Sequence, residues 1–378
     1  MTYRIGVIGG GQLARMMVPP AVHLGIDISV LAEVEGSSAR LAATQVGDYH
    51  DVPTVLEFAA GVDAVTFDHE HVPQPVLRAL VDAGVEVHPS PEALFVAQDK
   101  IVMRERLTAL GLPVPAWASV RGRDDLAAFL GEHGGRAVVK TPRGGYDGKG
   151  VRVVRSADDA DDWFASLGAT GDSDELLVEE LVEFRRELAQ LVARRPSGEM
   201  VAWPLVETVQ RDGVCAEVTA PAPDAGEALS DEARRIATVV AEEVGVTGVL
   251  AVELFETTDG RLLVNELAMR PHNTGHWSID GAVTSQFEQH LRAVLDLPLG
   301  DTTPHRAWSV MVNVLGGPAQ GTMADRLPAL MADQPGAKVH DYGKEPRPGR
   351  KVGHVTTTGP DLEDARARAR AAVRFFED

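Results

Sequence analysis

Apolar and polar residues in the first part of this chain alternate in short runs that predict strands separated by helices. The predicted strands share apolar centres and end in glycine or polar residues, and they cover residues 4–8, 27–33, 64–67 and 85–88. Strands that alternate with helices are typical of an α/β unit with a parallel sheet. We therefore expect a parallel-sheet domain over residues 1–98.

Beyond this point the pattern contains more strands. Ser90 and Asp99 each begin a predicted helix, and the prolines at 113 and 115 interrupt regular structure. Further strands are predicted at residues 136–140, 175–182, 186–193, 308–315, 338–342 and 354–358. The fold class we expect is a multidomain α/β and α+β protein. Its second domain covers residues 99–298 with a lid subdomain at about 117–180, and its small β-rich third domain covers 299–378.

A final helix is predicted after Asp361, with apolar residues on one face. Its four arginines, Arg366, Arg368, Arg370 and Arg374, are expected on the solvated side of that helix.

Composition narrows the class of protein. A chain of 378 residues is long for one core, which predicts two or three domains. No run approaches the ~20 apolar residues of a membrane helix, and no targeting segment is visible, so we expect a cytoplasmic protein. The formal net charge of −20 argues against a nucleic-acid or membrane surface. The single Cys215 excludes an internal disulfide and is expected to be a structural thiol.

Two apolar runs on either side of the turn signal Thr257-Thr-Asp-Gly260 predict a β-hairpin. Counting from that turn sets Ala251 opposite Glu266, so that Glu253 lies diagonal to Glu266 on the same face. Two carboxylates this close repel unless a cation lies between them, and their oxygens suit Mg²⁺. The alternative is a pair of exposed charges on a solvated hairpin face.

Polar residues with no hydrophobic period follow the second hairpin strand. Arg270, His272, Asn273 and His276 lie in a segment that Pro271 and Gly275 mark as irregular. Arginine presents a planar donor fork, and the other side chains add donors. The segment is therefore a candidate for holding a carboxylate-like or bicarbonate-like anion beside a metal-bound phosphate.

A glycine-rich segment follows the predicted strand that ends at Lys140. It reads Thr141-Pro-Arg-Gly-Gly-Tyr-Asp-Gly-Lys-Gly-Val151 and lacks the pattern of a P-loop. Exposed backbone N–H groups, with Lys140 and Lys149, would cradle phosphates. The alternative is an ordinary glycine-rich hairpin tip.

The N-terminal strand runs into Gly9-Gly-Gly-Gln-Leu-Ala14, which fits G-x-G-x-x-A, and Glu33 ends the next strand. This arrangement favours a rival hypothesis, a nicotinamide-dependent dehydrogenase. Another polar segment, Asp68-His-Glu-His71, is too local for a zinc site and is better interpreted as a loop that contacts substrate.

Several segments, in their order along the chain, resemble the ATP-grasp ligases, which clamp ATP between two α+β subdomains. They are Lys140, Gly144-Gly-Tyr-Asp-Gly-Lys-Gly150, Glu179-Glu-Leu-Val182, Glu187, Glu253 and Asn265-Glu266. Within that superfamily the chain is similar to the 5-(carboxyamino)imidazole ribonucleotide synthases. The motifs that carry this similarity are Gly9-Gly-Gly-Gln-Leu13, Asn265-Glu-Leu-Ala268, Arg270-Pro-His-Asn-Thr-Gly-His-Trp277, Met311-Val-Asn313 and Arg347-Pro-Gly-Arg-Lys-Val-Gly-His354.

The resemblance implies an N-terminal pre-ATP-grasp domain, an ATP-grasp domain with a glycine-flap lid, and a C-terminal domain. It implies a purine-biosynthesis ligase that uses ATP, bicarbonate and 5-aminoimidazole ribonucleotide with Mg²⁺ or Mn²⁺, acts through carboxyphosphate, and forms a homodimer.

The resemblance also assigns roles to individual residues. The implied ATP-binding residues are Lys100, Lys140, Gly145, Tyr146, Asp147, Gly148, Lys149, Gly150, Glu179, Glu180, Leu181, Val182, Glu187, Gln210, Asn265 and Glu266. The implied metal ligands are Glu253 and Glu266, and the implied catalytic residues are Arg270, His272, Asn273 and Lys351. The implied contacts to the aminoimidazole ribonucleotide are Gln12, Glu70, Tyr146, Arg350 and Lys351.

Two positions depart from simple expectation. Gln210 stands where some relatives carry histidine, and Asn265 adjoins Glu266, so the two side chains share a face only if the strand bulges. Two further alternatives stay open on the sequence. One is another ATP-grasp carboxylate–amine ligase, such as a formate-using ribonucleotide transformylase, and the other is a non-catalytic nucleotide sensor.

Overall fold

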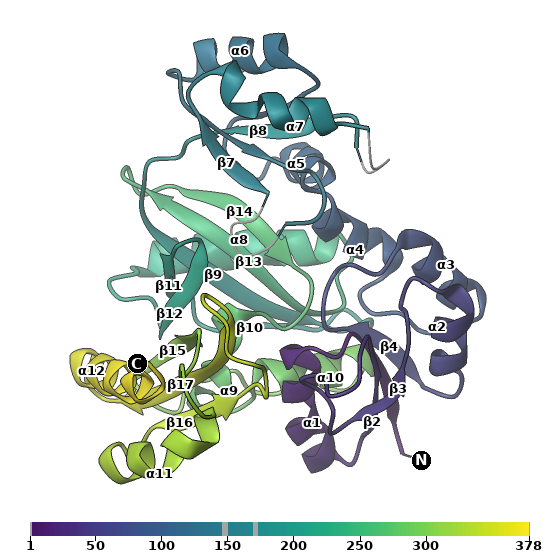
Figure 1. Ribbon diagram of the computed structural model, residues 1–378, viewed down its shortest axis with the longest axis vertical. Coiled ribbons are helices and arrows are strands. Elements are labelled where there is room, and N and C mark those ends of the chain that lie inside the picture. Colours follow the sequence, from purple (N-terminus) through teal and green to yellow (C-terminus); the bar gives the residue numbers. More distant parts are fainter. Residues whose placement is uncertain (1, 146–149, 169–172, 378) are drawn as a thin grey trace.

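The computed structural model describes residues 2–145, 150–168 and 173–377. The chain forms an N-terminal α/β unit, a small lid at the top of Figure 1, and a long antiparallel sheet that runs beneath the lid into the C-terminal region. This arrangement confirms the expected fold class. No helix in the described ranges is long and apolar enough to cross a membrane.

The N-terminal unit is built on a four-stranded parallel sheet in the order β3-β2-β1-β4. Its strands are β1 (Arg4–Ile8), β2 (Asp27–Ala32), β3 (Ala43–Val46) and β4 (Ala64–Phe67). Its helices are α1 (Gln12–Leu24), α2 (Val52–Ala59), α3 (Gln74–Asp82) and α4 (Pro91–Gln98). The strand expected at residues 85–88 is reduced to a single bridge between Val65 and Val87, because Pro89 follows without the N–H that a longer ladder needs.

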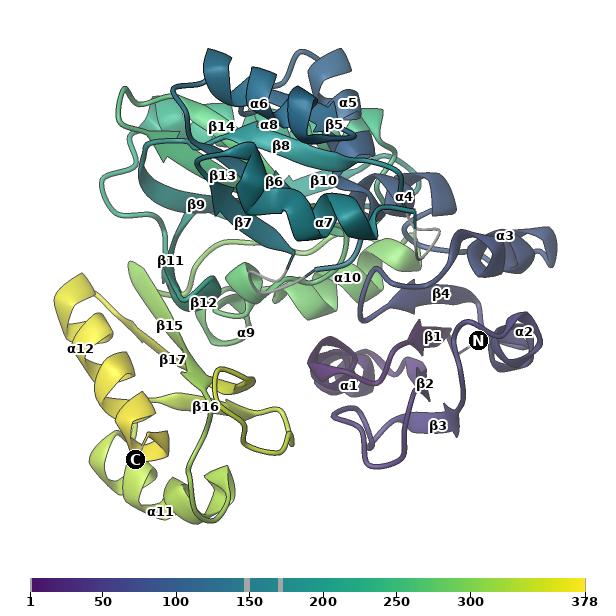
Figure 2. The ribbon, with the colours of Figure 1, turned by 45° about the horizontal axis from the view of Figure 1, so that its top comes forward.

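The lid is an antiparallel sheet in the order β5-β8-β6-β7, with helices packed on one side (Figure 2). Asp99 caps the helix that leads into it, by accepting hydrogen bonds from the N–H groups of Ile101 and Val102. The elements are α5 (Lys100–Ala109), β5 (Trp117–Val120), α6 (Arg123–Glu132), β6 (Ala137–Lys140), β7 (Val151–Val154), a 3-10 turn (Ala157–Ala160), α7 (Asp161–Ser166) and β8 (Leu176–Glu180).

The long sheet has the order β14-β13-β9-β11-β12-β15-β17-β16, with β10 paired to β9. Its strands are β9 (Phe184–Arg194), β10 (Met200–Ala202), β11 (Val206–Arg211), β12 (Val214–Ala220), β13 (Gly248–Thr257), β14 (Leu262–Ala268), β15 (Trp308–Leu315), β16 (Lys338–Asp341) and β17 (Lys351–Gly359). The C-terminal strands therefore extend the sheet of the central region rather than forming one of their own.

Helices pack against this sheet in both its central and its C-terminal parts. Their bounds, with the short 3-10 turns, are α8 (Glu227–Glu243), Asn273–Gly275, α9 (Ser278–Gly281), α10 (Gln286–Val294), α11 (Met323–Asp333), α12 (Leu362–Val373) and Arg374–Phe376. Helix α8 packs Ile236 and Val240 against Leu188 and Val252 on one face of the sheet. Helix α10 instead joins the N-terminal unit, where Leu291 shares a buried cluster with residues of β1 and α1.

Two arginines of α12 differ from the expectation that the basic set is solvated. Arg366 and Arg370 both bind the carboxylate of Glu217 on β12, at 3.0 and 2.7 Å, and only 4% of the Glu217 side chain is exposed. The spacing of four residues puts both guanidinium groups on the same face of the helix. The helix is therefore anchored to the sheet by charge as well as by its apolar face.

We expect the double substitution Arg366→Met and Arg370→Met to lower the free energy of unfolding by about 3 kcal/mol, because it leaves a buried carboxylate without a counter-charge. The matched control is Arg234→Met with Arg235→Met on α8, whose ion pairs are exposed and should contribute roughly 0–1 kcal/mol. Urea unfolding of both double variants checks this. Equal losses would show that the Glu217 pairs contribute no more than surface pairs.

Candidate active site

One face of the long sheet carries a row of carboxylates beneath the lid. Glu187 on β9 pairs with Thr208 on β11 and with Phe255 on β13. Glu253 lies two residues before Phe255, on the same face, and pairs directly with Glu266 on β14. The strand register thus brings together Glu187, Glu253 and Glu266, which the sequence had placed on three separate strands.

The direct pairing of Glu253 with Glu266 corrects the predicted register, in which Ala251 faced Glu266. A β-bulge interrupts the ladder after Glu253, and the next pair joins Leu254 to Val264. Both Val264 and Leu267 pack in the core beneath α8, so Asn265 and Glu266 between them lie on the opposite face. Because of this bulge, the side chains of the neighbouring residues Asn265 and Glu266 can both face the site.

The electrostatics of this pair fit a bound cation. Burial, and then the charges of Glu266 and Glu187, raise the pKa of Glu253 to about 8, so without a positive partner this carboxyl holds its proton at neutral pH. Two carboxylates and an amide oxygen are hard ligands of the kind Mg²⁺ prefers. Within the described ranges no group of three His, Cys, Asp or Glu side chains is placed so that it could hold a metal ion.

A buried charge network connects the lid to this sheet. Lys140, at the end of β6, lies 2.7 Å from a carboxylate oxygen of Glu179 on β8 and donates to Asn265 Oδ1 at 3.4 Å. The fully buried Arg104 of α5 binds the other oxygen of Glu179 and donates to the Asn265 carbonyl at 2.6 Å. Burial raises the pKa of Glu179, but the charges of Arg104 and Lys140 outweigh burial and lower it.

The glycine-rich segment is described only at its ends. Gly145 and Gly150 have positive φ angles of 75° and 71°, which non-glycine residues rarely adopt. Lys100 donates to the carbonyl of Gly144 at 3.1 Å, and burial lowers its pKa. The predicted residues Tyr146, Asp147, Gly148 and Lys149 lie outside the described residues.

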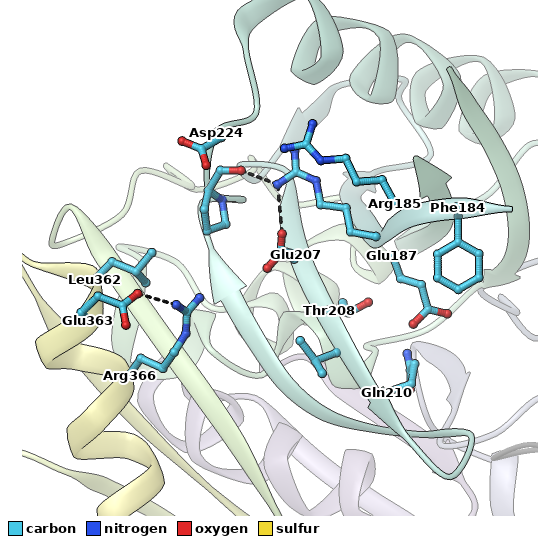
Figure 3. A pocket seen from close by; sticks show the side chains of 13 residues that line it. Phe184, Arg185, Glu187, Glu207, Thr208, Gln210, Asp224, Leu362, Glu363 and Arg366 are labelled. Carbon is cyan, nitrogen blue, oxygen red and sulfur yellow. Dashed lines mark hydrogen bonds and ion pairs between the residues drawn. The ribbon is translucent and has the colours of Figure 1, made fainter. Parts of the chain in front are cut away.

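Two predicted nucleotide residues line a cavity of about 590 Å³ (Figure 3). Glu187 and Gln210 lie on adjacent strands with Phe184 beside them, and Arg366 of α12 closes the far side. Burial raises the pKa of Glu187 to about 7. Lys140 and Glu266 are not part of this lining.

The segment between β8 and β9 leads from the lid to this cavity. Glu180, the last residue of β8, accepts a hydrogen bond from the N–H of Ala116 at 3.0 Å. Leu181 and Val182 follow it, half-buried, between the lid and the sheet.

The polar loop after β14 lies at the end of the carboxylate row. Arg270 donates to Glu70 of the N-terminal unit at 2.6 Å, and His272 Nε2 lies 3.3 Å from Glu253. Burial, and then the charges of Arg270 and Lys351, hold the pKa of His272 well below its usual value, so the imidazole is neutral. The buried side chain of Asn273 lies against Cys215.

The predicted substrate residues come from both ends of the chain. Gln12 at the start of α1 accepts a hydrogen bond from Lys344, and Arg350 donates to the Glu345 carbonyl at 3.1 Å. Lys351 begins β17, and its charge acts on both His272 and Glu253. The structure thus brings the first and last thirds of the chain to the loop that carries Arg270.

The glycine turn after β1 differs from a dinucleotide site. Gly10 N–H donates to Glu33 at 3.0 Å, and Ala14 N–H donates to Asp68 at 2.7 Å. A Cβ on Gly11 would lie 2.0 Å from an Asp68 oxygen. Because carboxylates already bind these N–H groups, the turn does not present them to a pyrophosphate.

Sequence reasoning missed three residues of the site region. Arg104 is one turn of helix beyond Lys100, a spacing that would have suggested a shared face. Lys344 and Gln286 carried no signal, because each reaches its partner only through the tertiary fold. The expected structural thiol is present, since Cys215 is buried and burial raises its pKa to about 12.

Three family models match the chain. A ribonucleotide synthetase preATP-grasp domain matches residues 1–98, an ATP-grasp domain matches residues 105–287, and a phosphoribosylaminoimidazole carboxylase C-terminal domain matches residues 309–368. Together they follow the three regions of the fold.

Relatives of known name agree along the whole length. The N5-carboxyaminoimidazole ribonucleotide synthase of Mycobacterium bovis is 52% identical over 98% of this chain and 87% of its own. The solved synthetase from Thermus thermophilus has a TM-score of 0.87 at 38% identity and covers 99% of both chains. The Aspergillus clavatus enzyme, solved with ADP and 5-aminoimidazole ribonucleotide, has a TM-score of 0.88 at 30% identity and covers 99% of this chain and 98% of its own.

The raised pKa of Glu187 predicts a pH-dependent effect on stability. The folded protein holds this proton more tightly than the unfolded chain, so the stability that it contributes is lost as the pH rises from 4.5 through 7. We expect Glu187→Gln to raise the melting temperature relative to the parent at pH 8 and to leave it unchanged near the ordinary glutamate pKa.

The matched control for this prediction is Glu183→Gln, which lies four residues earlier, just before β9, and is exposed. Thermal unfolding of both variants at pH 8 and at low pH separates the two cases. A stabilisation by Glu187→Gln that is the same at both pH values would contradict the raised pKa.

Proposed function

The chain belongs to the N5-carboxyaminoimidazole ribonucleotide synthases, and on that premise we propose how its own residues carry out the reaction. The activity is the ATP-dependent carboxylation of 5-aminoimidazole ribonucleotide in purine biosynthesis, by an ATP-grasp ligase. The observation that carries the assignment of residues is the row formed by Glu187, Glu253 and Glu266, with Lys140 above it and Arg270 at its end.

ATP binds between the lid and the long sheet. In the proposed arrangement Glu187 holds the ribose, residues 179–182 meet the adenine edge, and Lys100 and Lys140 contact phosphates. The support is that Lys140 already lies at Asn265 and that Glu187 lines a cavity formed in part by β9 and β11. The glycine-rich segment, including Tyr146, Asp147, Gly148 and Lys149, is proposed to close over the phosphates.

Glu253 and Glu266 are proposed to hold one or two Mg²⁺ ions, with Asn265 beside them; Mn²⁺ suits the same oxygen ligands. When bound, the ion neutralises phosphate charge and orients the γ-phosphoryl group. Burial, and then the neighbouring charges of Glu266 and Glu187, raise the pKa of Glu253, and this supports the assignment because a cation would favour the charged form.

Bicarbonate is proposed to bind at Arg270, His272 and Asn273. There its oxygen attacks the γ-phosphorus of ATP, which releases ADP and forms carboxyphosphate. Loss of phosphate from carboxyphosphate then delivers carbon dioxide next to the exocyclic amine. A neutral His272 can donate one hydrogen bond without adding charge, while Arg270 supplies the positive charge.

The aminoimidazole ribonucleotide is proposed to lie between the N-terminal unit and the Arg270 loop. Gln12, Glu70 and Tyr146 are its expected contacts, and Arg350 and Lys351 are expected at its phosphate. The proximity of Glu70 to Arg270 supports this position, because it joins the N-terminal unit to the bicarbonate loop.

Family membership decides against the alternative ligase that uses formate, and the occupied glycine turn argues against the dehydrogenase. The function is tested by ADP release with and without bicarbonate, and with and without aminoimidazole ribonucleotide. Full turnover should require both. ADP release that ignores bicarbonate would overturn the bicarbonate assignment, and the absence of any nucleotide turnover would favour a sensor.

We also propose a homodimer on the strength of the family resemblance. Sedimentation velocity of the purified protein tests it, since a monomer at micromolar concentration would contradict the proposal.

We expect Glu266→Gln to lower turnover by orders of magnitude, because the nearly isosteric amide keeps the hairpin but removes one charge that would hold Mg²⁺ against the phosphates. Asp259→Asn in the exposed turn of the same hairpin is the control and should turn over normally. ADP production at saturating Mg²⁺ is the measurement. Near-normal activity of Glu266→Gln would remove this residue from the metal site.

We expect Arg270→Lys to weaken bicarbonate use while ATP binding survives, because lysine keeps the charge but loses the planar fork. One lost charge-assisted bond costs roughly 1.5–3 kcal/mol, or about ten- to a hundredfold in turnover per bicarbonate. Bicarbonate titration at saturating ATP measures it, with the exposed Arg261→Lys as control. A change in the nucleotide response alone would move Arg270 to the ATP site.

A further inference from the structure

Gln286 is a completely buried residue that opens helix α10. Ser285 caps this helix by accepting a hydrogen bond from the N–H of Glu288, so the amide of Gln286 is not needed as a cap. Its side chain points instead into the loop that carries Arg270 and His272.

The amide of Gln286 binds both backbone groups of one residue. Its Oε1 accepts from the N–H of His272 at 2.8 Å, and its Nε2 donates to the His272 carbonyl at 2.7 Å. The second Nε2 hydrogen points to His276 Nδ1 at 2.8 Å. Both donors of the amide are thus used, and the paired bonds hold the His272 peptide groups as a neighbouring strand would.

The path of the loop depends on this amide. A Cβ at Gly275 would lie 2.4 Å from Gln286 Oε1 and 2.3 Å from Leu191, so only glycine lets the loop approach so closely. We call the two hydrogen bonds between the Gln286 amide and the His272 backbone the clamp. His272 connects this clamp to the carboxylate row, since its Nε2 lies 3.3 Å from a Glu253 oxygen. Arg270 is two residues upstream of the clamped peptide.

We propose that Gln286 is a positioning residue for bicarbonate use. It fixes the backbone of His272 so that the side chains of His272 and Arg270 face the bicarbonate that accepts the γ-phosphoryl group. This inference rests on the proposed bicarbonate site. Small displacements of reacting groups cost large factors in rate, and a buried clamp with two backbone bonds resists such displacement because breaking it leaves buried polar groups unsatisfied.

Gln289, on the same helix, provides a matched control. It is equally buried, and it clamps the backbone of Gly300 in the same way, with Nε2 donating to the carbonyl at 2.8 Å and Oε1 accepting from the N–H at 2.7 Å. Gly300 lies in the connection that follows α10 and carries no proposed role. Replacing either glutamine by leucine removes a comparable pair of backbone bonds, and Gln286→Leu also removes the bond to His276.

The experiment compares Gln286→Leu with Gln289→Leu by melting temperature and by saturation with ATP and with bicarbonate. We expect similar losses of thermal stability. Only Gln286→Leu should lose about ten- to a hundredfold in kcat/KM for bicarbonate, with the KM for ATP unchanged. Bicarbonate responses that match in the two variants would overturn the proposal, as would an equal loss in the ATP and bicarbonate responses of Gln286→Leu.

Arg270→Lys, measured in parallel, separates this inference from the proposed function. If Arg270→Lys leaves the bicarbonate response unchanged, the bicarbonate site itself is wrong. If Arg270→Lys weakens that response and Gln286→Leu does not, positioning by Gln286 is wrong. Should Gln286→Leu fail to fold, Gln286→Asn takes its place: it keeps a neutral amide but is one methylene shorter, so it cannot keep all three bonds, and it should show a smaller loss confined to bicarbonate; an unchanged bicarbonate response in a folded Gln286→Asn would overturn the proposal.

Discussion

The repulsion between Glu253 and Glu266 is the constraint around which this site is built. The two carboxylates face each other across one pair of strands, and Glu187 adds a third on the same face of the sheet. Burial, and then the charges of Glu266 and Glu187, raise the pKa of Glu253 to about 8, so without a cation Glu253 keeps its proton at neutral pH, and the proposed Mg²⁺ would take the place of that proton.

The positive charges around this row are held away from it by other partners. Arg104 and Lys140 both bind Glu179, and Arg270 binds Glu70. Each of these three basic residues is therefore oriented by a carboxylate that is not a proposed metal ligand. This division keeps Glu253 and Glu266 available to a divalent ion, while the cations stay close enough to meet phosphate or bicarbonate oxygens.

Much of this could be predicted from the sequence, because local patterns carry it. The hairpin, the lysine-ended strand and the Arg270 loop all follow from short runs of residues and turn signals. The predicted register is wrong by two residues, since Ala251 faces Ala268 rather than Glu266. One residue of this shift arises at the hairpin turn, where Glu256 faces Leu262, and the other is the bulge at Asn265, which no turn signal marks. The hydrogen bonds of Gln286 to His272 could not be predicted either, and for Arg104 the sequence offered only its spacing from Lys100, not its partners Glu179 and Asn265. Each depends on which distant backbone the fold brings alongside.

Because one sheet combines strands of the central and C-terminal regions, the central region cannot complete its sheet until the C-terminal strands are present. Strand β12 pairs on one side with β11 and on the other with β15. Residues 221–307 separate β12 from β15 in the sequence. Until the last quarter of the polypeptide has been synthesised, β12 presents an open edge with unsatisfied backbone groups, a template for pairing with other chains. The C-terminal strands therefore cover a strand edge that would favour aggregation. A chain shortened before β15 would retain every proposed ATP-binding residue but would leave the edge of β12 exposed.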